Sequence, residues 1–123
     1  MNLHATHSYG SARSPAKDPR TVEAALLSRI TARLHEANRG RKIDYPTLVS
    51  ALDDNRHFWS LIAIDLASEG NRLPDTLRAS LISIAGFVLS HTVSVLSSEA
   101  VVDPLLDINR AVITGLSSEN VMI

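Results

Sequence analysis

The stretch 55–66 constrains the fold most, because it places the single tryptophan inside an almost continuous apolar segment. At 3.6 residues per turn, one stripe of this segment is apolar and further apolar residues lie beside it. The stripe consists of Trp59, Ile62 and Leu66. The flanking positions are Phe58, Leu61 and Ile64. Such a helix must be covered on more than one face, either by its own chain or by another one.

The length and composition favour one cytoplasmic domain. A chain of 123 residues can bury roughly two thirds of its unfolded surface as one unit. It has no cysteine, so disulfides and thiolate chemistry are excluded and a reducing compartment suits it. Residues 1–10 contain no continuous apolar stretch and do not resemble a secretory signal. We expect a cytoplasmic location.

The net charge of −1 conceals an asymmetry along the chain. Residues 1–42 hold eight Lys and Arg against three acidic residues, a net of +5, while the remainder holds four against ten, a net of −6. A basic front of this kind suits an acidic partner or RNA, or simply the acidic remainder of its own fold.

The positions of helix-capping residues, prolines and glycines predict an all-α, small four-helix antiparallel bundle with a mobile N-terminal arm. Residues 1–18 have too little apolar content for a helix and are expected to form the arm. A helical domain follows over 19–116, and 117–123 are expected to form a tail. Helix starts are predicted from an acidic cap followed by proline, and helix ends from glycine in the left-handed conformation. The capped starts are Pro19 (after Asp18), Asp44 and Asp103, and the glycine ends lie near Gly40, Gly70 and Gly115. The remaining helix is expected to start near Asp75, after Pro74, and to run to about Ser98.

Two alternatives concern the third predicted helix. Its stretch 79–96 has no charged side chain and reaches the length of a membrane span, but six polar positions interrupt it and favour a core helix. Residues 92–95 alternate polar and apolar as in a strand. The surrounding helical pattern is longer and contains no turn signal, so a helix is favoured there.

No set of residues supports catalysis, a metal or a cofactor. Asp53 and His57 share a helix face as a metal pair would, but two ligands do not complete a site. His91 is interpreted as a hydrogen-bonded histidine at the edge of the core. Asp65 stands among apolar residues and either pairs with Arg78 or faces water. We therefore expect no enzymatic activity.

An ordered series of short motifs resembles the FlaF-type family of flagellar proteins. It covers about 110 positions of the chain. The matching positions are Tyr9-Gly10, Pro19-Arg20 and Glu23, Asn55-Arg56 and Trp59, Asp65-Leu66, 70–74 with Leu77-Arg78, Pro104-Leu105, 107–110 and Gly115-Leu116. The resemblance implies a non-enzymatic cytoplasmic protein required for flagellin synthesis and export. It also implies a flagellin secretion chaperone that opposes a FlbT-type repressor, and it supplies no catalytic or binding residues.

The surplus of apolar helix surface and this resemblance together suggest a site for flagellin. We expect a groove beside the second and third predicted helices to receive an amphipathic helix of this client. The residues expected at this groove are Phe58, Trp59, Leu61, Phe87 and Leu89.

Two other functions are compatible with the same sequence. The basic front could bind flagellin messenger RNA directly, although it has only two tyrosines for stacking on bases and no RNA-binding motif. The phosphate contacts would then come from Arg29, Arg33, Arg39, Arg41 and Lys42. The surplus apolar face could also serve self-association. The sequence alone does not decide the oligomeric state or whether the FlbT-type regulator is a direct partner.

Overall fold

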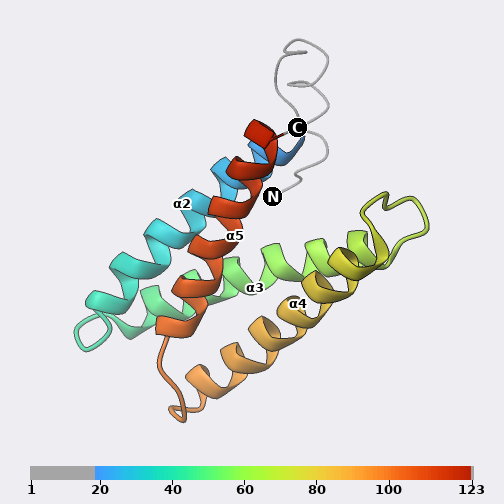
Figure 1. Ribbon diagram of the computed structural model, residues 1–123. Coiled ribbons are helices and arrows are strands. Elements are labelled where there is room, and N and C mark those ends of the chain that lie inside the picture. Colours follow the sequence, from blue (N-terminus) through green and yellow to red (C-terminus); the bar gives the residue numbers. More distant parts are fainter. Residues whose placement is uncertain (1–18, 123) are drawn as a thin grey trace.

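The computed structural model describes residues 19–122, and the side-chain surroundings of residues 23–116. This part of the chain forms four helices, and the predicted all-α four-helix fold is confirmed (Figure 1). The helices are α2 (Pro19–Arg39), α3 (Tyr45–Ala67), α4 (Asp75–Leu96) and α5 (Asp103–Met122). The predicted arm, with the proposed cap Asp18, lies outside the described residues.

The helices form two antiparallel pairs. In Figure 1, α2 lies beside α5, and α3 turns back into α4. Helix α2 also packs against α3, whereas α4 has little contact with α5. The two pairs meet near the α2–α3 loop and diverge toward the α3–α4 turn (Figure 1). The bundle is therefore closed at one end and open at the other.

The core is built around α3, as its wide apolar arc predicts. Its side chains from Leu48 to Trp59 are buried at intervals of three and four residues, and Leu66 continues the series. Helix α2 buries a narrow stripe against it. That stripe runs through Leu27, Ile30, Leu34 and Ala37, so that Leu26 is displaced to the edge. Helix α5 contributes Leu105 and Leu106, both almost fully buried.

The start of α3 follows the predicted cap chemistry, whereas α4 begins after Pro74 without a side-chain cap, and the described helices do not end on a left-handed glycine as predicted. Asp44 caps α3 by accepting from the backbone N–H of Thr47. No described glycine has a positive φ. Among the described residues, the one non-glycine with a positive φ is Ser98, at 63°, beyond the end of α4. Helix α5 passes through Gly115 and reaches Met122, because a glycine inside a helix weakens it without ending it.

Helix α4 is far less buried than its apolar composition suggests. It buries Ala85, Val88, Thr92 and Val95, all on one side. It is a helix throughout 92–95, so the strand alternative is wrong. By length and composition α4 could cross a membrane, and 22% of its apolar window is buried within the fold. Helix α4 therefore contributes one side to the core, and its opposite side is exposed.

Two polar residues placed by the sequence pattern have defined partners. The Nε2 atom of His91 lies 2.7 Å from the backbone carbonyl oxygen of Val101, which confirms the hydrogen-bonded interpretation. Asp65 is exposed and accepts a hydrogen bond from the Nδ2 atom of Asn71 at 3.0 Å. Of the two alternatives for Asp65, the exposed position is confirmed and the pairing with Arg78 is not, because Arg78 contacts Asp75 one turn earlier on the same helix.

A buried hydrogen-bond chain joins α3 to α5. The indole Nε1 of Trp59 donates to Oδ1 of Asn109 at 3.0 Å, and Nδ2 of Asn109 donates to Oδ1 of Asn55 at 2.8 Å. Trp59 is 1% exposed, and both asparagines are completely buried. Breaking either bond would leave a further buried polar group unpaired besides Nδ2 of Asn55, which has no partner among the described residues, so the chain of bonds fixes the position of α5 on α3.

Removing the middle of this chain should destabilise the fold. The substitution Asn109→Ala leaves the Trp59 N–H and the Asn55 carbonyl unpaired inside the core. We expect it to lower the free energy of unfolding by about 2–4 kcal/mol, as measured by urea denaturation. The control Asp107→Ala alters an exposed residue of the same helix and should change it by less than about 0.5 kcal/mol. Equal effects of the two substitutions would show that the buried bonds are unimportant.

A second prediction concerns Glu23, whose pKa is raised above its ordinary value of 4.5 by burial and by the negative charge of Asp65. The folded state then holds this proton more tightly than the unfolded state, so stability is lost as the pH rises through the folded pKa. We expect Glu23→Gln to raise the urea midpoint at pH 7, and the gain to vanish below pH 4.5. The exposed control Glu69→Gln should show no such pH dependence. A gain that is the same at both pH values would contradict the assignment.

Candidate functional site

A groove between α2 and α3 is the larger of two hollows that lie along these helices. Its volume is about 560 Å³. The floor of the groove is apolar. Helix α2 contributes Leu26 and Ile30, and helix α3 contributes Phe58 and Leu61. The groove lies where α2 and α3 begin to diverge, so their spacing exposes the edges of side chains that a closed bundle would cover (Figure 1).

The two rims of the groove carry opposite charges. Arg29 and Arg33 line it from α2, whereas Asp53, Asp54 and His57 line it from α3. Arg33 and Asp54 form an ion pair across the rims, with Nη1 and Oδ2 2.6 Å apart. Their side chains are 61% and 41% exposed, so this pair is solvated and contributes little stability. The rims can therefore exchange this contact for contacts with a charged ligand.

The five residues predicted to bind flagellin do not form one surface. Phe58 and Leu61 line the α2–α3 groove, Phe58 mostly as part of its buried floor. Trp59 points the other way and is bound to α5, so its side chain belongs to the core. Phe87 and Leu89 lie on α4, where Phe87 is 47% exposed and stacks on His91. The structure thus brings together only two of the five.

Sequence reasoning missed the contribution of α2 to the groove. Leu26 and Ile30 lie four residues apart on α2, a helical spacing that predicts a place on the core side for both. The structure buries Leu27 in place of Leu26, which turns Leu26 toward the groove. Leu26 and Leu27 are adjacent in an apolar pair, and this pair was the only signal that one of them could lie outside the core.

The five basic residues of the RNA alternative are also separated. Arg29 and Arg33 belong to the groove rim, and the other three lie at the end of α2 and in the loop after it. Three of the five contact oxygen atoms of the protein. These contacts join Arg33 to Asp54 at 2.6 Å, Arg39 to Glu36 at 3.6 Å and Arg41 to the backbone carbonyl of Asn38 at 2.9 Å. Acidic side chains therefore interrupt the basic surface.

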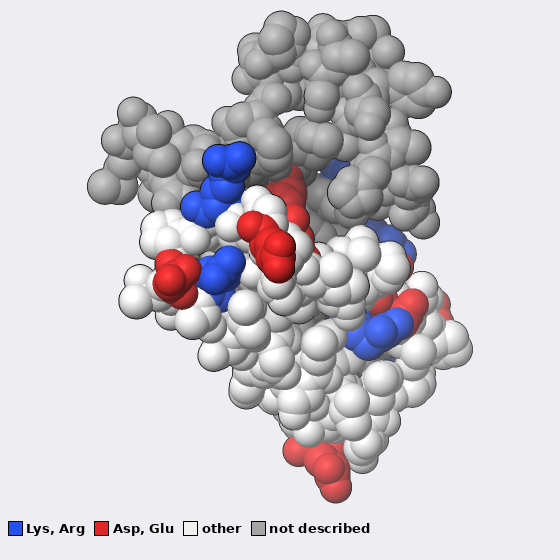
Figure 2. All heavy atoms as spheres, turned by 90° about the vertical axis from the view of Figure 1, so that its right-hand side faces the viewer, with Lys and Arg blue, Asp and Glu red and all other residues white. Residues whose placement is uncertain are grey.

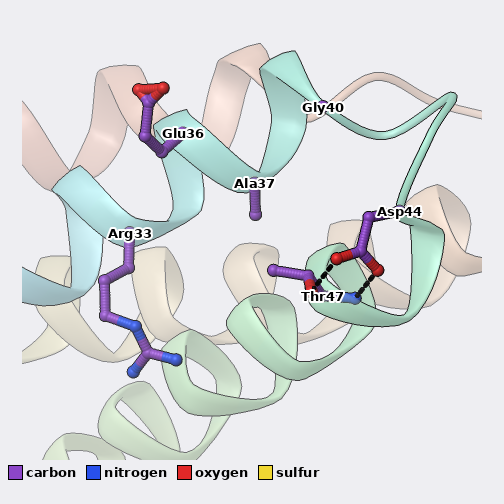
Figure 3. Close-up of a pocket in the computed structure, with 6 residues that line it drawn as sticks. All are labelled: Arg33, Glu36, Ala37, Gly40, Asp44 and Thr47. Carbon is purple, nitrogen blue, oxygen red and sulfur yellow. Dashed lines mark hydrogen bonds between the residues drawn. The ribbon is translucent and has the colours of Figure 1, made fainter.

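A smaller hollow beside the α2–α3 loop has a structural explanation. It measures about 340 Å³ and is lined by residues from Arg33 to Thr47. In Figure 3 the side chain of Ala37 points into it, while Arg33 and Glu36 point away from each other. The carboxylate of Asp44 is occupied by the backbone N–H and hydroxyl of Thr47, at 3.2 and 2.6 Å. This hollow is the concave side of a helix cap, and the hydrogen bonds of its Asp44 carboxylate are made within the fold.

The groove can bind an apolar or amphipathic ligand, and the described residues offer no catalytic set around it. His57 and Asp53 share a rim, but no group of three metal-ligating side chains occurs in the described part of the chain. Carboxylates, guanidinium groups and one imidazole on a solvated rim can orient a charged ligand. The arrangement is suited to recognition.

Comparison with known proteins identifies the family. Residues 5–116 match the family described as Flagellar protein FlaF, which is most of the 123-residue chain. The comparisons with curated proteins and with solved structures gave no significant match. The matched region contains the groove, the buried hydrogen-bond chain and α4. The chain belongs to the FlaF family of flagellar proteins.

Proposed function

We propose that this flagellar protein binds flagellin in the cytoplasm and acts as its secretion chaperone, without enzymatic activity. The observation that supports this proposal is the α2–α3 groove, with its apolar floor and its two rims of opposite charge. By keeping flagellin competent for export, the protein supports flagellin synthesis and opposes a FlbT-type repressor. This opposition needs no direct contact between the two regulators.

The groove has the form that an amphipathic helix requires. Its α2 wall runs from Leu26 to Arg33 and its α3 wall from Asp53 to Leu61, each about 10–12 Å long at 1.5 Å per residue. That length matches two turns of a bound helix, which would insert apolar side chains at positions i, i+3 or i+4, and i+7. A site of two turns binds reversibly, as a chaperone must when its client is exported.

The rims define the orientation of the client. A helix with acidic residues along one edge and basic residues along the other can face Arg29 and Arg33 with the first edge, and Asp53 and Asp54 with the second. The reversed helix would place like charges together on both rims, which is unfavourable. The groove is therefore expected to prefer one direction of the flagellin helix.

Flagellin titration with groove variants tests this proposal. We expect purified monomeric flagellin to bind the full chain, and Leu61→Lys to weaken binding at least tenfold by placing a charge on the apolar floor, as measured by isothermal titration calorimetry. The matched control is Ile64→Lys, one turn further along α3. Ile64 is 67% exposed and does not line the groove, so this variant should bind as the wild type does.

Three results would count against the proposal. These are the lack of any complex with flagellin, equal binding by the two variants, and a loss of binding confined to Ile64→Lys. Far-ultraviolet circular dichroism and urea unfolding of both variants would exclude a folding defect. If the chain instead bound flagellin messenger RNA with an affinity that falls steeply with salt, the RNA alternative would replace the chaperone role.

A further inference from the structure

The α2–α3 groove and the smaller hollow are consecutive parts of one crevice. Arg33 lines both of them. On α2, the lining residues seven positions before and after Arg33 are Leu26 in the groove and Gly40 in the smaller hollow. On α3, the lining residues seven positions before and after the ion-pair partner of Arg33 are Thr47 and Leu61. Seven residues are about two helical turns, so these positions share one side of each helix, and each wall is roughly 21 Å long.

The Arg33–Asp54 ion pair divides this crevice at its middle, and a ligand can displace it. Its Nη1 and Oδ2 atoms lie 2.6 Å apart, and Figure 3 shows the Arg33 side chain extending from α2 toward α3. Both side chains are solvated, so breaking the pair costs little. Beyond the pair, the side chain of Ala37 points into the smaller hollow, and Gly40 has no side chain (Figure 3). An apolar side chain of a ligand therefore has room on the far side of the pair.

The acidic groups around this ion pair have partners of their own, close to them in the sequence. These partners are Arg56 for Asp53 at 2.7 Å, Arg39 for Glu36 at 3.6 Å, and Thr47 for Asp44 at 2.6 Å. Arg29 lies one turn before Arg33 and also lines the groove, and His57 lines it from α3. At the middle of the crevice, α2 therefore presents positive charge and α3 presents negative charge.

Charge complementarity identifies the ligand that can displace the pair. An uncharged ligand would leave both Arg33 and Asp54 without a partner, and a ligand of one sign would leave one of them without a partner. A ligand that carries a carboxylate and a cation at the same level exchanges one ion pair for two. A broad area of the face shown in Figure 2 has no Lys, Arg, Asp or Glu, so such a ligand finds no equivalent site there.

We propose that the Arg33–Asp54 ion pair is a removable bar across the crevice, and that the flagellin segment is an amphipathic helix of about four turns with an acidic and a basic residue at its middle. The first two turns fill the groove between Leu26 and Leu61. The two charged residues then take over Arg33 and Asp54, and the remaining turns reach Ala37. When the client leaves, the pair re-forms, which keeps binding reversible. This inference rests on the proposed function and defines the client segment.

Calorimetric titration of monomeric flagellin into the full chain tests this inference with two variants. The exchange of Arg33→Asp with Asp54→Arg keeps an ion pair across the crevice but reverses its sign, so we expect at least tenfold weaker binding. Gly40→Phe places a large side chain at the smaller hollow and should weaken binding at least fivefold. A Cβ at Gly40 would lie 3.9 Å from the carbonyl oxygen of Glu36, an ordinary contact. The matched control Gly70→Phe lies in the α3–α4 turn, where a Cβ meets nothing within 4 Å, and should bind as the wild type does.

Wild-type affinity in either variant would overturn this inference. In the charge-exchange variant it would show that flagellin does not take over the pair, and in Gly40→Phe it would show that the client stops at the bar. If Leu61→Lys still weakens binding in that case, the proposed function stands without the bar. If the wild-type chain forms no complex with flagellin, both are overturned. Urea unfolding compares the stability of the variants, and Gly40→Phe decides alone if the charge-exchange variant does not fold.

Discussion

The fold depends most on the buried hydrogen bond between Trp59 and Asn109. Together with the bond from Asn109 to Asn55 it joins the middle of α3 to α5. An indole N–H left unpaired in this core would lower the free energy of unfolding by more than the hydrogen bond itself contributes to it. Helix α5 can therefore adopt few positions on α3. Apolar packing alone would tolerate slippage of the helices. The polar chain specifies one register and thereby sets where α2 and α3 diverge.

The bundle leaves apolar surface in two places of different character. The α2–α3 groove is bordered by guanidinium groups on one side and carboxylates on the other, so it distinguishes ligands by charge as well as by shape. The outer face of α4 carries no charge from Ala79 to Leu96 and can distinguish ligands only through its ends. A small chain with one central helix cannot cover four helices completely. Both apolar surfaces remain exposed because the chain has too few side chains to cover all faces of its helices.

Much of the fold could be predicted from the sequence, because helix starts depend on local chemistry. Asp44 predicted the start of α3, and the apolar stripe that contains Trp59 and Leu66 predicted part of its buried side. The site was harder to predict. Whether Trp59 lies in the core or in a groove depends on the angle between helices, and local periodicity does not contain that angle. For the same reason the helical spacing of Leu26 did not predict that it lies outside the core, at the groove.

Nuclear magnetic resonance mapping of the flagellin complex tests the central claim most directly, since it reports every backbone amide of this small protein at once. On addition of monomeric flagellin, the account predicts that the largest amide shift changes occur along both walls of the groove, from Leu26 to Arg33 and from Asp53 to Leu61. Amides on the outer face of α4 should change little. Changes confined to α4, or to the loop that carries Arg41 and Lys42, would contradict the account.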